Sequence, residues 1–200
     1  KNDWVLFEEA LRLHDERHGY RYYYRTREAE LKTPVDRAAR FVYLNRTCFN
    51  GIYRVNVDGK FNVPKGTKDS VLTDDDSFVD IARTLTNAEL RAGDFEDLVD
   101  QAKQDDFVFA DPPYTVRHNI NGFLKYNEQL FSWADQERLA ESIVRARKRG
   151  AFVVVTNANH KSVRDLYRAH GFRLSVVSRF SSISAESKSR RQFEELLIRG

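Results

Sequence analysis

The stretch Phe107-Val108-Phe109-Ala110-Asp111-Pro112-Pro113-Tyr114 decides how the rest of the chain is interpreted. Its four apolar residues end at a carboxylate and two prolines, a pattern typical of a strand buried on both faces of a sheet. In open α/β sheets, ligands bind beyond the carboxyl ends of the strands, so Asp111 would lie at a site of chemistry. Asp-Pro-Pro is also a good strand terminator, because proline has no N–H and restricts the residue before it. Both interpretations stay open on this stretch alone.

The composition suits one sizeable core, or one domain with a smaller inserted unit, because the 200 residues are 41% hydrophobic. No apolar run approaches the ~20 residues that a transmembrane helix needs, and no segment resembles a signal peptide. We therefore expect a cytoplasmic protein without a membrane partner. The single cysteine, Cys48, excludes an internal disulfide, and no Cys/His cluster has the spacing of a metal site. We expect Cys48 to be a packing residue and no metal to be bound.

The net charge of +3 is the difference between 33 basic and 30 acidic residues, so local patches matter more than the total. Between residues 12 and 54, arginines are mixed with tyrosines, which suits a polyanion with stacking faces, namely nucleic acid. The residues concerned are Arg17, Arg21, Arg25, Arg27, Arg37, Arg40 and Arg46 with Tyr20, Tyr22, Tyr23 and Tyr24. A solvated helical surface is the alternative, and composition alone does not exclude it.

The apolar periodicity predicts alternating helices and strands. Helices are expected over residues 4–14, 36–44, 78–85, 96–103, 132–149 and 162–169, with Gly19 ending the first, and strands over 88–91, 107–110, 151–156, 172–180 and 193–198. The order of strand 88–91, short helix and strand 107–110 predicts a parallel pair with a right-handed crossover. The last two strands have no helix between them and should pair antiparallel. Residues 115–131 have no period, and a loop of this length is often a functional lid.

Two alternating runs on either side of Asp58-Gly59 predict a β-hairpin over residues 49–64. A two-stranded ribbon is narrow enough to enter the major groove of DNA. Asn50, Arg54, Asn56 and Lys65 carry side chains of the types that contact base edges or phosphates. A surface hairpin with another purpose is the competing interpretation.

Six short motifs in order resemble the DNA N6-adenine methyltransferases of the Dam type, which use S-adenosylmethionine. They are Leu44–Gly51, Phe61–Pro64, Gly93-Asp94-Phe95, Asp111–Tyr114, Asp135-Gln136 and Glu195–Ile198. The resemblance implies an α/β fold, a Rossmann-like methyltransferase sheet closed by an antiparallel C-terminal hairpin, with an inserted recognition unit of helices and a hairpin. We accordingly expect a target-recognition domain over residues 1–82 and the C-terminal part of a catalytic α/β domain over residues 83–200.

The resemblance lacks the family's opening segment, which carries a lysine, an aromatic-x-Gly-x-Gly turn and an acidic residue, all directed to the cofactor. No Gly-x-Gly occurs anywhere in this sequence. We therefore expect the first strands of the sheet to be missing from these residues. A partner chain that carries the missing segment is one explanation, and loss of the segment from the sample is another. Loss of a first strand would also expose sheet edges.

The resemblance implies specific roles for the residues around the Asp-Pro-Pro-Tyr turn. The Asp111 carboxylate and the Pro112 carbonyl would accept the two N6 hydrogens of adenine, which localises the nitrogen lone pair by electrostatic positioning. Pro113 adds rigidity, and Tyr114 offers a face on which a flipped adenine stacks. Asp94 and Phe95, together with Asp111, would bind the cofactor. The alternative for Asp94 and Phe95 is a turn followed by a core phenylalanine.

By the same resemblance, double-stranded DNA is the partner, contacted by Asn50, Arg54, Asn56, Pro64 and Lys65. Arg54 is the candidate for guanine recognition at a GATC-like site. Two other functions remain open. One is a catalytically incomplete DNA-binding module, or one half of a split methyltransferase. The other is methyl transfer to an RNA adenine or a protein glutamine, although such enzymes usually carry Asn where this chain has Asp111.

Overall fold

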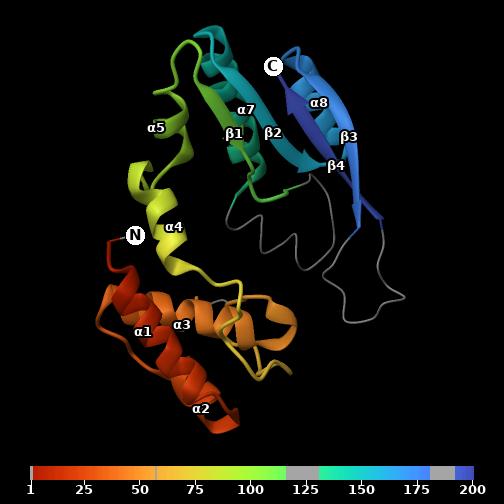
Figure 1. Cartoon of the computed structure of the whole chain (residues 1–200). Coiled ribbons are helices and arrows are strands. Elements are labelled where there is room, and N and C mark those ends of the chain that lie inside the picture. The colour runs from red at the N-terminus through yellow and green to blue at the C-terminus, as the bar shows by residue number, and fades with distance from the viewer. Residues whose placement is uncertain (1, 57, 116–130, 181–191) are drawn as a thin grey trace. The chain divides into compact units, whose positions relative to one another are not determined.

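The computed structural model describes residues 2–56, 58–115, 131–180 and 192–200 (Figure 1). The chain divides into two compact units, residues 1–90 and 91–200. The sequence placed a boundary between residues 82 and 83, and the roles assigned there to the two parts stay predictions. The segments 116–130 and 181–191 lie outside the described residues, and with them most of the predicted lid. None of the described helices is long and apolar enough to cross a membrane.

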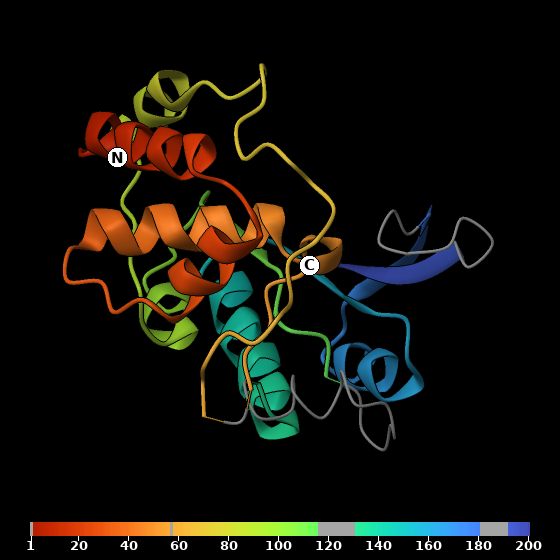
Figure 2. The same ribbon diagram turned by 90° about the horizontal axis from the view of Figure 1, so that it is seen from below.

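The first unit is built from helices (Figure 2). They are α1 (Trp4–Glu16), α2 (Tyr20–Glu28), α3 (Pro34–Thr47) and α4 (Phe78–Thr84), with the short 3-10 turns η1 (Phe49–Gly51) and η2 (Leu85–Asn87). Three of these helices were predicted, and Thr33 and Ser77 cap α3 and α4 by accepting a backbone N–H. The prediction that Gly19 ends the first helix is wrong. Gly19 precedes α2 with an extended backbone, and α1 ends at Glu16.

The core of the first unit lies between α1, α2 and α3. It contains Leu11, Tyr23, Tyr43, Leu44, Cys48, Val63 and Val71. Tyr23 is 0% exposed and donates a hydrogen bond to the carbonyl of Val63, at 2.9 Å. This tyrosine therefore packs α2 against the hairpin region and offers no stacking face, whereas Tyr20 is exposed. Cys48 is buried, as expected of a packing residue.

The predicted hairpin is a turn held by single bridges, without continuous strands. Val55 bridges Phe61, and Cys48 bridges Lys65, both antiparallel. Asn56 donates its backbone N–H to the carbonyl of Lys60 at 2.8 Å, and Gly59 supplies the positive φ of +73° that the turn requires. The Asp58-Gly59 turn is therefore confirmed, and the extended ladders are not, because an isolated two-stranded ribbon has few partners to stabilise it.

The second unit is a mixed α/β sheet, which confirms the predicted class. Its elements are α5 (Phe95–Val99), β1 (Phe107–Ala110), α7 (Trp133–Lys148), β2 (Phe152–Ala158), α8 (Lys161–Ala169), β3 (Arg173–Phe180) and β4 (Gln192–Arg199). The strand order is β1-β2-β4-β3, with β1 parallel to β2 and the other two pairs antiparallel. The antiparallel pairing of the last two strands is confirmed. The parallel crossover runs through α7 between β1 and β2.

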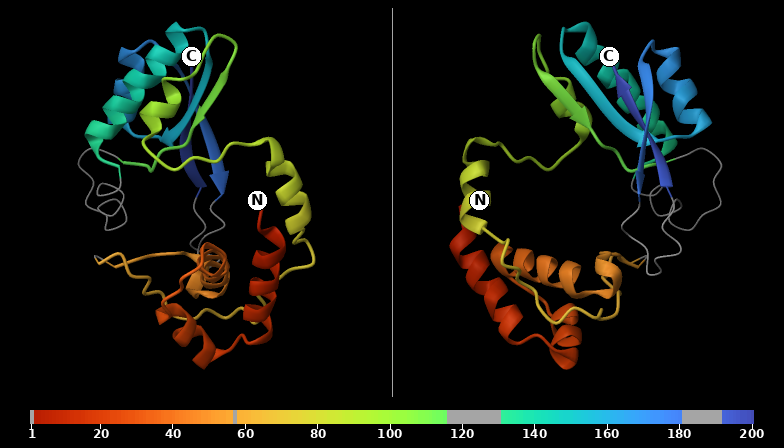
Figure 3. Two further views of the ribbon diagram at one scale, coloured as in Figure 1. Left: turned by 90° about the vertical axis from the view of Figure 1, so that its left-hand side faces the viewer. Right: turned by 45° about the vertical axis from the view of Figure 1, so that its right-hand side comes forward.

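Helices α7 and α8 cover one face of this sheet (Figure 3). Beneath them, Ile143 of α7, Val163 of α8, and Val153 and Val155 of β2 form a buried core. Ser132 caps α7 and forms a capping box with Asp135, in which each side chain accepts a backbone N–H. These two hydrogen bonds stabilise the start of α7.

Two predictions for the sheet are wrong. Residues 88–91 form no strand: Ala88 closes the 3-10 turn η2 by donating its N–H to the carbonyl of Leu85 at 3.1 Å, and the chain then runs irregularly to α5. β1 is not buried on both faces, since Phe107 is 65% and Phe109 58% exposed. The reason is its place at the sheet edge and the absence of a described helix of this unit over that face.

Candidate active site

The predicted catalytic turn follows β1 directly. Asp111 and Pro113 are exposed, Pro112 is buried and Tyr114 is half-buried. The hydroxyl of Thr156, on the neighbouring strand β2, donates a hydrogen bond to the Oδ1 atom of Asp111 at 2.5 Å. One carboxylate oxygen is therefore oriented by β2, and the second has no hydrogen bond within the described residues.

A buried pair of amides lies behind the same turn. Gln136, in the first turns of α7, donates from Nε2 to the carbonyl of Pro113 at 3.1 Å. Asn157, on β2, donates from Nδ2 to Gln136 Oε1 at 3.0 Å. These contacts join residues far apart in the chain, so they were not predicted from the sequence. Their signal in the sequence was Asp135-Gln136, which belonged to the resemblance but had been assigned no role.

Asp94 and Phe95 lie at the start of α5. Asp94 caps this helix by accepting the N–H of Glu96 at 2.9 Å, and its Oδ2 accepts two hydrogen bonds from Arg138 of α7, both at 2.9 Å. The hydrogen bond from Arg138 lowers the pKa of the Asp94 carboxyl below its usual range. The Arg138 guanidinium also lies 4.5 Å from the centre of the Phe95 ring. Helix α7 therefore fixes both predicted cofactor residues.

One cavity of about 970 Å³ joins the two predicted turns. It is lined by Gly93 to Phe95, by β1 and the turn from Asp111 to Pro113, and by Asp135 and Arg138 of α7. Its size reaches the upper end of the range for small-molecule sites, about 300 to 1,000 Å³. Because the cavity runs along β1, which has no described partner strand on that side, it also contains the space of an open sheet edge.

The five predicted DNA residues all belong to the first unit, and they differ in availability. Asn50 and Arg54 are exposed and have no polar partner among the described side chains. Asn56 accepts the backbone N–H groups of Asp58 and Lys60, at 3.0 and 2.9 Å, so its carbonyl oxygen is used within the turn. The Lys65 side chain is only 15% exposed and donates to the carbonyl of Gly66 at 3.2 Å.

The backbones of Pro64 and Asn50 also contribute to the conformation of this region. The carbonyl of Pro64 accepts the N–H of Phe49 at 2.9 Å. Asn50 and Gly51 both have positive φ angles, 57° and 64°. Over the parts of the chain that the structure describes, no group of three or more His, Cys, Asp or Glu side chains is arranged to hold a metal ion.

The segment that contains this site is similar in sequence to a known protein family. A family model described as "D12 class N6 adenine-specific DNA methyltransferase" matches residues 4–183, which include both turns of the cavity and the hairpin. The chain belongs to this methyltransferase family. In this family, N6 of adenine is the methyl acceptor and S-adenosylmethionine is the donor.

Individual methyltransferases are also similar to this chain in sequence. A type II methyltransferase of Lactococcus lactis subsp. cremoris, M1.LlaDCHI, is 32% identical over 95% of this chain and 69% of its own length. The type II methyltransferase M.MjaIII of Methanocaldococcus jannaschii is also 32% identical, over 96% of this chain and 69% of its own. A DNA N-6-adenine-methyltransferase of Escherichia phage P1 is 35% identical over 78% of this chain and 21% of its own. These relatives therefore contain residues beyond the matched region.

Proposed function

We propose that this protein transfers a methyl group from S-adenosylmethionine to N6 of an adenine flipped out of double-stranded DNA, with Asp111 to Tyr114 as the catalytic turn. The observation that carries the proposal is the shared cavity, in which the Asp94-Phe95 turn and the Asp111–Pro113 turn line one space. A cofactor site must lie beside an adenine site for direct transfer, and one cavity satisfies that requirement.

The chemistry requires a localised lone pair on N6. The Asp111 carboxylate and the Pro112 carbonyl accept the two amine hydrogens, which draws electron density onto nitrogen and aims its lone pair at the methyl group. Two consecutive prolines keep these acceptors from rotating away. Tyr114 supports the flipped base by stacking, a contribution of about 1 to 3 kcal/mol per base in comparable complexes.

The cavity has the chemistry that S-adenosylmethionine needs. The Asp111 carboxylate favours a cation, whereas that of Asp94 is paired with Arg138 and offers a hydrogen-bond acceptor. The Phe95 ring, 5.6 Å from that of Phe131, gives an apolar wall for a purine. S-adenosylmethionine would supply an electrophilic methyl group on a positively charged sulfur. The N6–CH3 bond would form as the S–CH3 bond breaks, S-adenosylhomocysteine would leave, and N6 would give up one hydrogen as a proton. Asp94 and Phe95 would hold S-adenosylmethionine, while the Thr156 hydroxyl keeps Asp111 oriented toward the adenine amine.

The first unit is the target-recognition domain in this proposal. Arg54 reads guanine in a GATC-like site, and Asn50 contacts the DNA beside it. Their exposure and lack of described polar partners support this role. Asn56, Pro64 and Lys65 shape the hairpin through the contacts described above and contact DNA with the groups that remain. Because its proposed substrate is DNA, we also place the protein in the cytoplasm.

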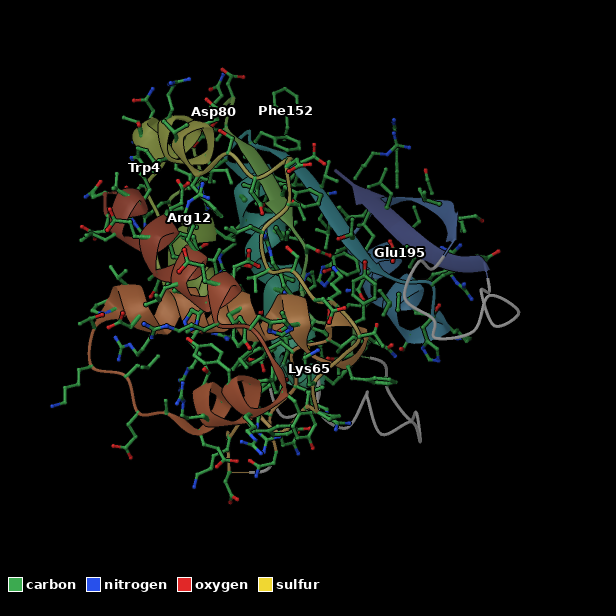
Figure 4. The ribbon with its side chains drawn as sticks, turned by 60° about the horizontal axis from the view of Figure 1, so that its bottom comes forward. Trp4, Arg12, Lys65, Asp80, Phe152 and Glu195 are labelled. Atoms are coloured by element: carbon green, nitrogen blue, oxygen red, sulfur yellow. The ribbon has the colours of Figure 1, made fainter. Side chains whose placement is uncertain are left out.

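The second unit is the C-terminal part of a Rossmann-like catalytic domain that further polypeptide completes. β1 pairs only with β2 among the described strands, and Phe107, Phe109 and Phe152 are 58 to 65% exposed on one face of this pair. The Phe152 ring projects away from the sheet (Figure 4). We assign both features to a strand and an apolar helix outside these 200 residues, because matched relatives are longer. Hydrogen exchange on the full-length protein should protect β1 amides that exchange in this chain alone.

The test of the main proposal is methyl transfer to defined duplexes by the full-length protein. Duplexes with a GATC site, with shuffled sites and with N6-methylated GATC are compared, and Asp111→Ala is the inactive control. N6-methyladenine in duplex DNA is expected, and its absence from every duplex would overturn the proposal. Calorimetry with S-adenosylmethionine separates the alternative, since a DNA-binding module without catalysis takes up no cofactor.

A further inference from the structure

The catalytic turn has an unusual shortage of backbone donors. Pro112 and Pro113 have no N–H, so the turn cannot be fixed by hydrogen bonds from its own two central residues. Their carbonyl oxygens are the polar groups that remain, and the Pro112 carbonyl is needed for adenine. Another part of the molecule must therefore hold the turn through the Pro113 carbonyl or through Asp111.

Two consecutive residues of β2 meet this need from opposite faces of the sheet. Successive side chains in a strand point to opposite faces, so Thr156 and Asn157 cannot lie on the same side. Thr156 donates directly to Asp111 on one face. On the other face, Asn157 donates to Gln136, and Gln136 donates to the Pro113 carbonyl.

Gln136 and Asn157 are 0% exposed, which makes the contacts between them consequential. A buried amide without partners costs several kcal/mol, roughly 2 to 7 depending on the reference state, so such groups are kept only where they are satisfied. The capping box of Ser132 and Asp135 fixes the start of α7, and with it the place of Gln136. The amide pair is therefore anchored on both α7 and β2.

The direction of the hydrogen bonds is also determined at both ends. The backbone N–H of Ala158 can only donate, and it donates to Asn157 Oδ1 at 2.9 Å. Asn157 must then present its NH₂ to Gln136, which must accept with Oε1 and present its own NH₂ to the Pro113 carbonyl. Because that carbonyl can only accept, the order Ala158, Asn157, Gln136, Pro113 has one consistent orientation.

We propose that Gln136 and Asn157 are positioning residues that hold the Pro113 carbonyl, and thereby the Asp111-Pro112 acceptors, in register with the adenine amine. This inference rests on the proposed function, because it assigns a task to the turn that performs it. Neither amide touches the adenine or the cofactor in this assignment. Their effect on catalysis passes through the turn.

Three substitutions in the full-length protein separate positioning from simple packing. Gln136→Leu removes the amide donor and leaves the Pro113 carbonyl with the longer contact from Thr115 Oγ1, at 3.4 Å, whose hydroxyl lies closer to the carbonyl of Phe131, at 2.6 Å. We expect its single-turnover methylation rate to fall by about 10- to 100-fold. Asn157→Asp does not touch the turn, but at about pH 9, where the introduced carboxyl is ionised, it accepts from Gln136, reverses that amide and directs an oxygen at the Pro113 carbonyl. It should lower the rate as much. Ser142→Ala, which removes another buried polar group of α7 bonded to Leu139, is the control and should leave the rate within about twofold.

The substitution Gln136→Glu gives a readout that a structural role would not produce. When the introduced carboxyl group is protonated, it donates to the Pro113 carbonyl as the native amide does, whereas its ionised form repels that carbonyl. Since burial raises the pKa of a carboxyl, the rate relative to wild type should be near normal at about pH 6 and fall as the pH rises to about 9. Gln136→Leu should show a pH-independent ratio.

A second measurement does not depend on activity. These 200 residues contain four prolines, so carbonyl-labelled proline gives few resonances from this part of the protein. The Pro113 resonance should shift in Gln136→Leu and Asn157→Asp but not in Ser142→Ala. Unchanged Pro113 resonances, or rates within twofold of wild type in all variants, would overturn the inference. A wild-type protein that methylates nothing would instead overturn the proposed function, and the Pro113 resonance still decides whether the amides hold the turn.

Discussion

The Thr156 hydroxyl donates a hydrogen bond to the Oδ1 atom of Asp111 at 2.5 Å, across the parallel pair β1 and β2. Thr156 lies one residue beyond Val155, which pairs with Ala110, so the register of the sheet itself places the hydroxyl beside the carboxylate. Because Oδ1 is engaged, it is the other carboxylate oxygen that accepts a hydrogen from adenine in the proposed reaction. The neighbouring strand thus sets the orientation of the predicted catalytic group.

Thr156→Val should lower the single-turnover methylation rate by about 10-fold, because it removes the hydroxyl while keeping the shape of the side chain. The affinity for S-adenosylmethionine and the melting temperature should change little. Thr156→Ser keeps the donor and should restore most of the rate. A Thr156→Val protein as fast as wild type would show that Asp111 does not need this hydrogen bond.

Arg138 should control cofactor binding through Asp94 and Phe95. Arg138→Gln removes the two hydrogen bonds to Asp94 Oδ2 and the contact with the Phe95 ring, so the Kd for S-adenosylmethionine, measured by calorimetry, should rise about 10-fold. Arg145→Gln is the matched control. Arg145 lies on the same helix and pairs with Glu96 and Asp100, without a hydrogen bond to Asp94.

If both variants weaken the cofactor equally, the effect comes from docking of α5 on α7 rather than from Asp94 itself. If neither does, Asp94 and Phe95 have the alternative role of a turn and a core phenylalanine. Arg138 and Asp94 are both partly exposed, so their ion pair contributes little to the stability of the folded protein. Melting temperatures of the two variants should therefore stay close together.

The ion pair between Arg46 and Asp76 makes the stability of the first unit depend on pH. Its closest atoms are 2.5 Å apart, and the hydrogen bond from Arg46 lowers the pKa of the Asp76 carboxyl to about 2. A carboxyl with a lower pKa in the folded state stabilises the fold above its unfolded pKa, near 3.8, and loses that contribution as the pH falls toward 2. The contribution is of the order of 2 kcal/mol at neutral pH.

Asp76→Asn should therefore lower the free energy of unfolding at pH 7, and its difference from wild type should shrink between about pH 4 and pH 2. Urea unfolding followed by Trp4 fluorescence measures this in the first unit, with Trp133→Phe as the background in both proteins. A difference that stays constant down to pH 2 would mean that the substitution acts through packing rather than through the charge.

The sequence predicted elements best where a local signal was strong. Six helices, the Asp58-Gly59 turn and the antiparallel end of the sheet follow from apolar periodicity, caps and turn residues. The prediction of a strand over residues 88–91 was wrong, because apolar periodicity does not show whether a segment will pair with a neighbouring strand. β1 was assigned two buried faces because its apolar run gives no sign that one face lacks a cover.

Motifs in the sequence suggest candidate site residues, but they do not predict the partners of those residues. Asp111 and Asp94 were found from motifs, whereas Arg138, Gln136 and Thr156 come from other elements and meet the turns only through the fold. Asn56 and Lys65 show the opposite case. Both are residue types that contact DNA, yet their side chains bond to nearby backbone groups, Asn56 within the turn and Lys65 at Gly66. Sequence spacing does not reveal this competition.

Arg54 should determine base preference, and Lys60, exposed in the same hairpin, should not. Arg54→Ala removes a group that can bond guanine with two parallel hydrogen bonds, so discrimination against substitutions at one base pair should weaken by about 1 to 3 kcal/mol. Lys60→Ala should reduce the affinity for all duplexes alike and lower the salt slope, since an exposed lysine acts as a point charge. Competition methylation with single-substituted duplexes at two salt concentrations separates the two effects. If Arg54→Ala behaves as Lys60→Ala does, Arg54 contacts a phosphate, and the guanine must be read elsewhere in the first unit.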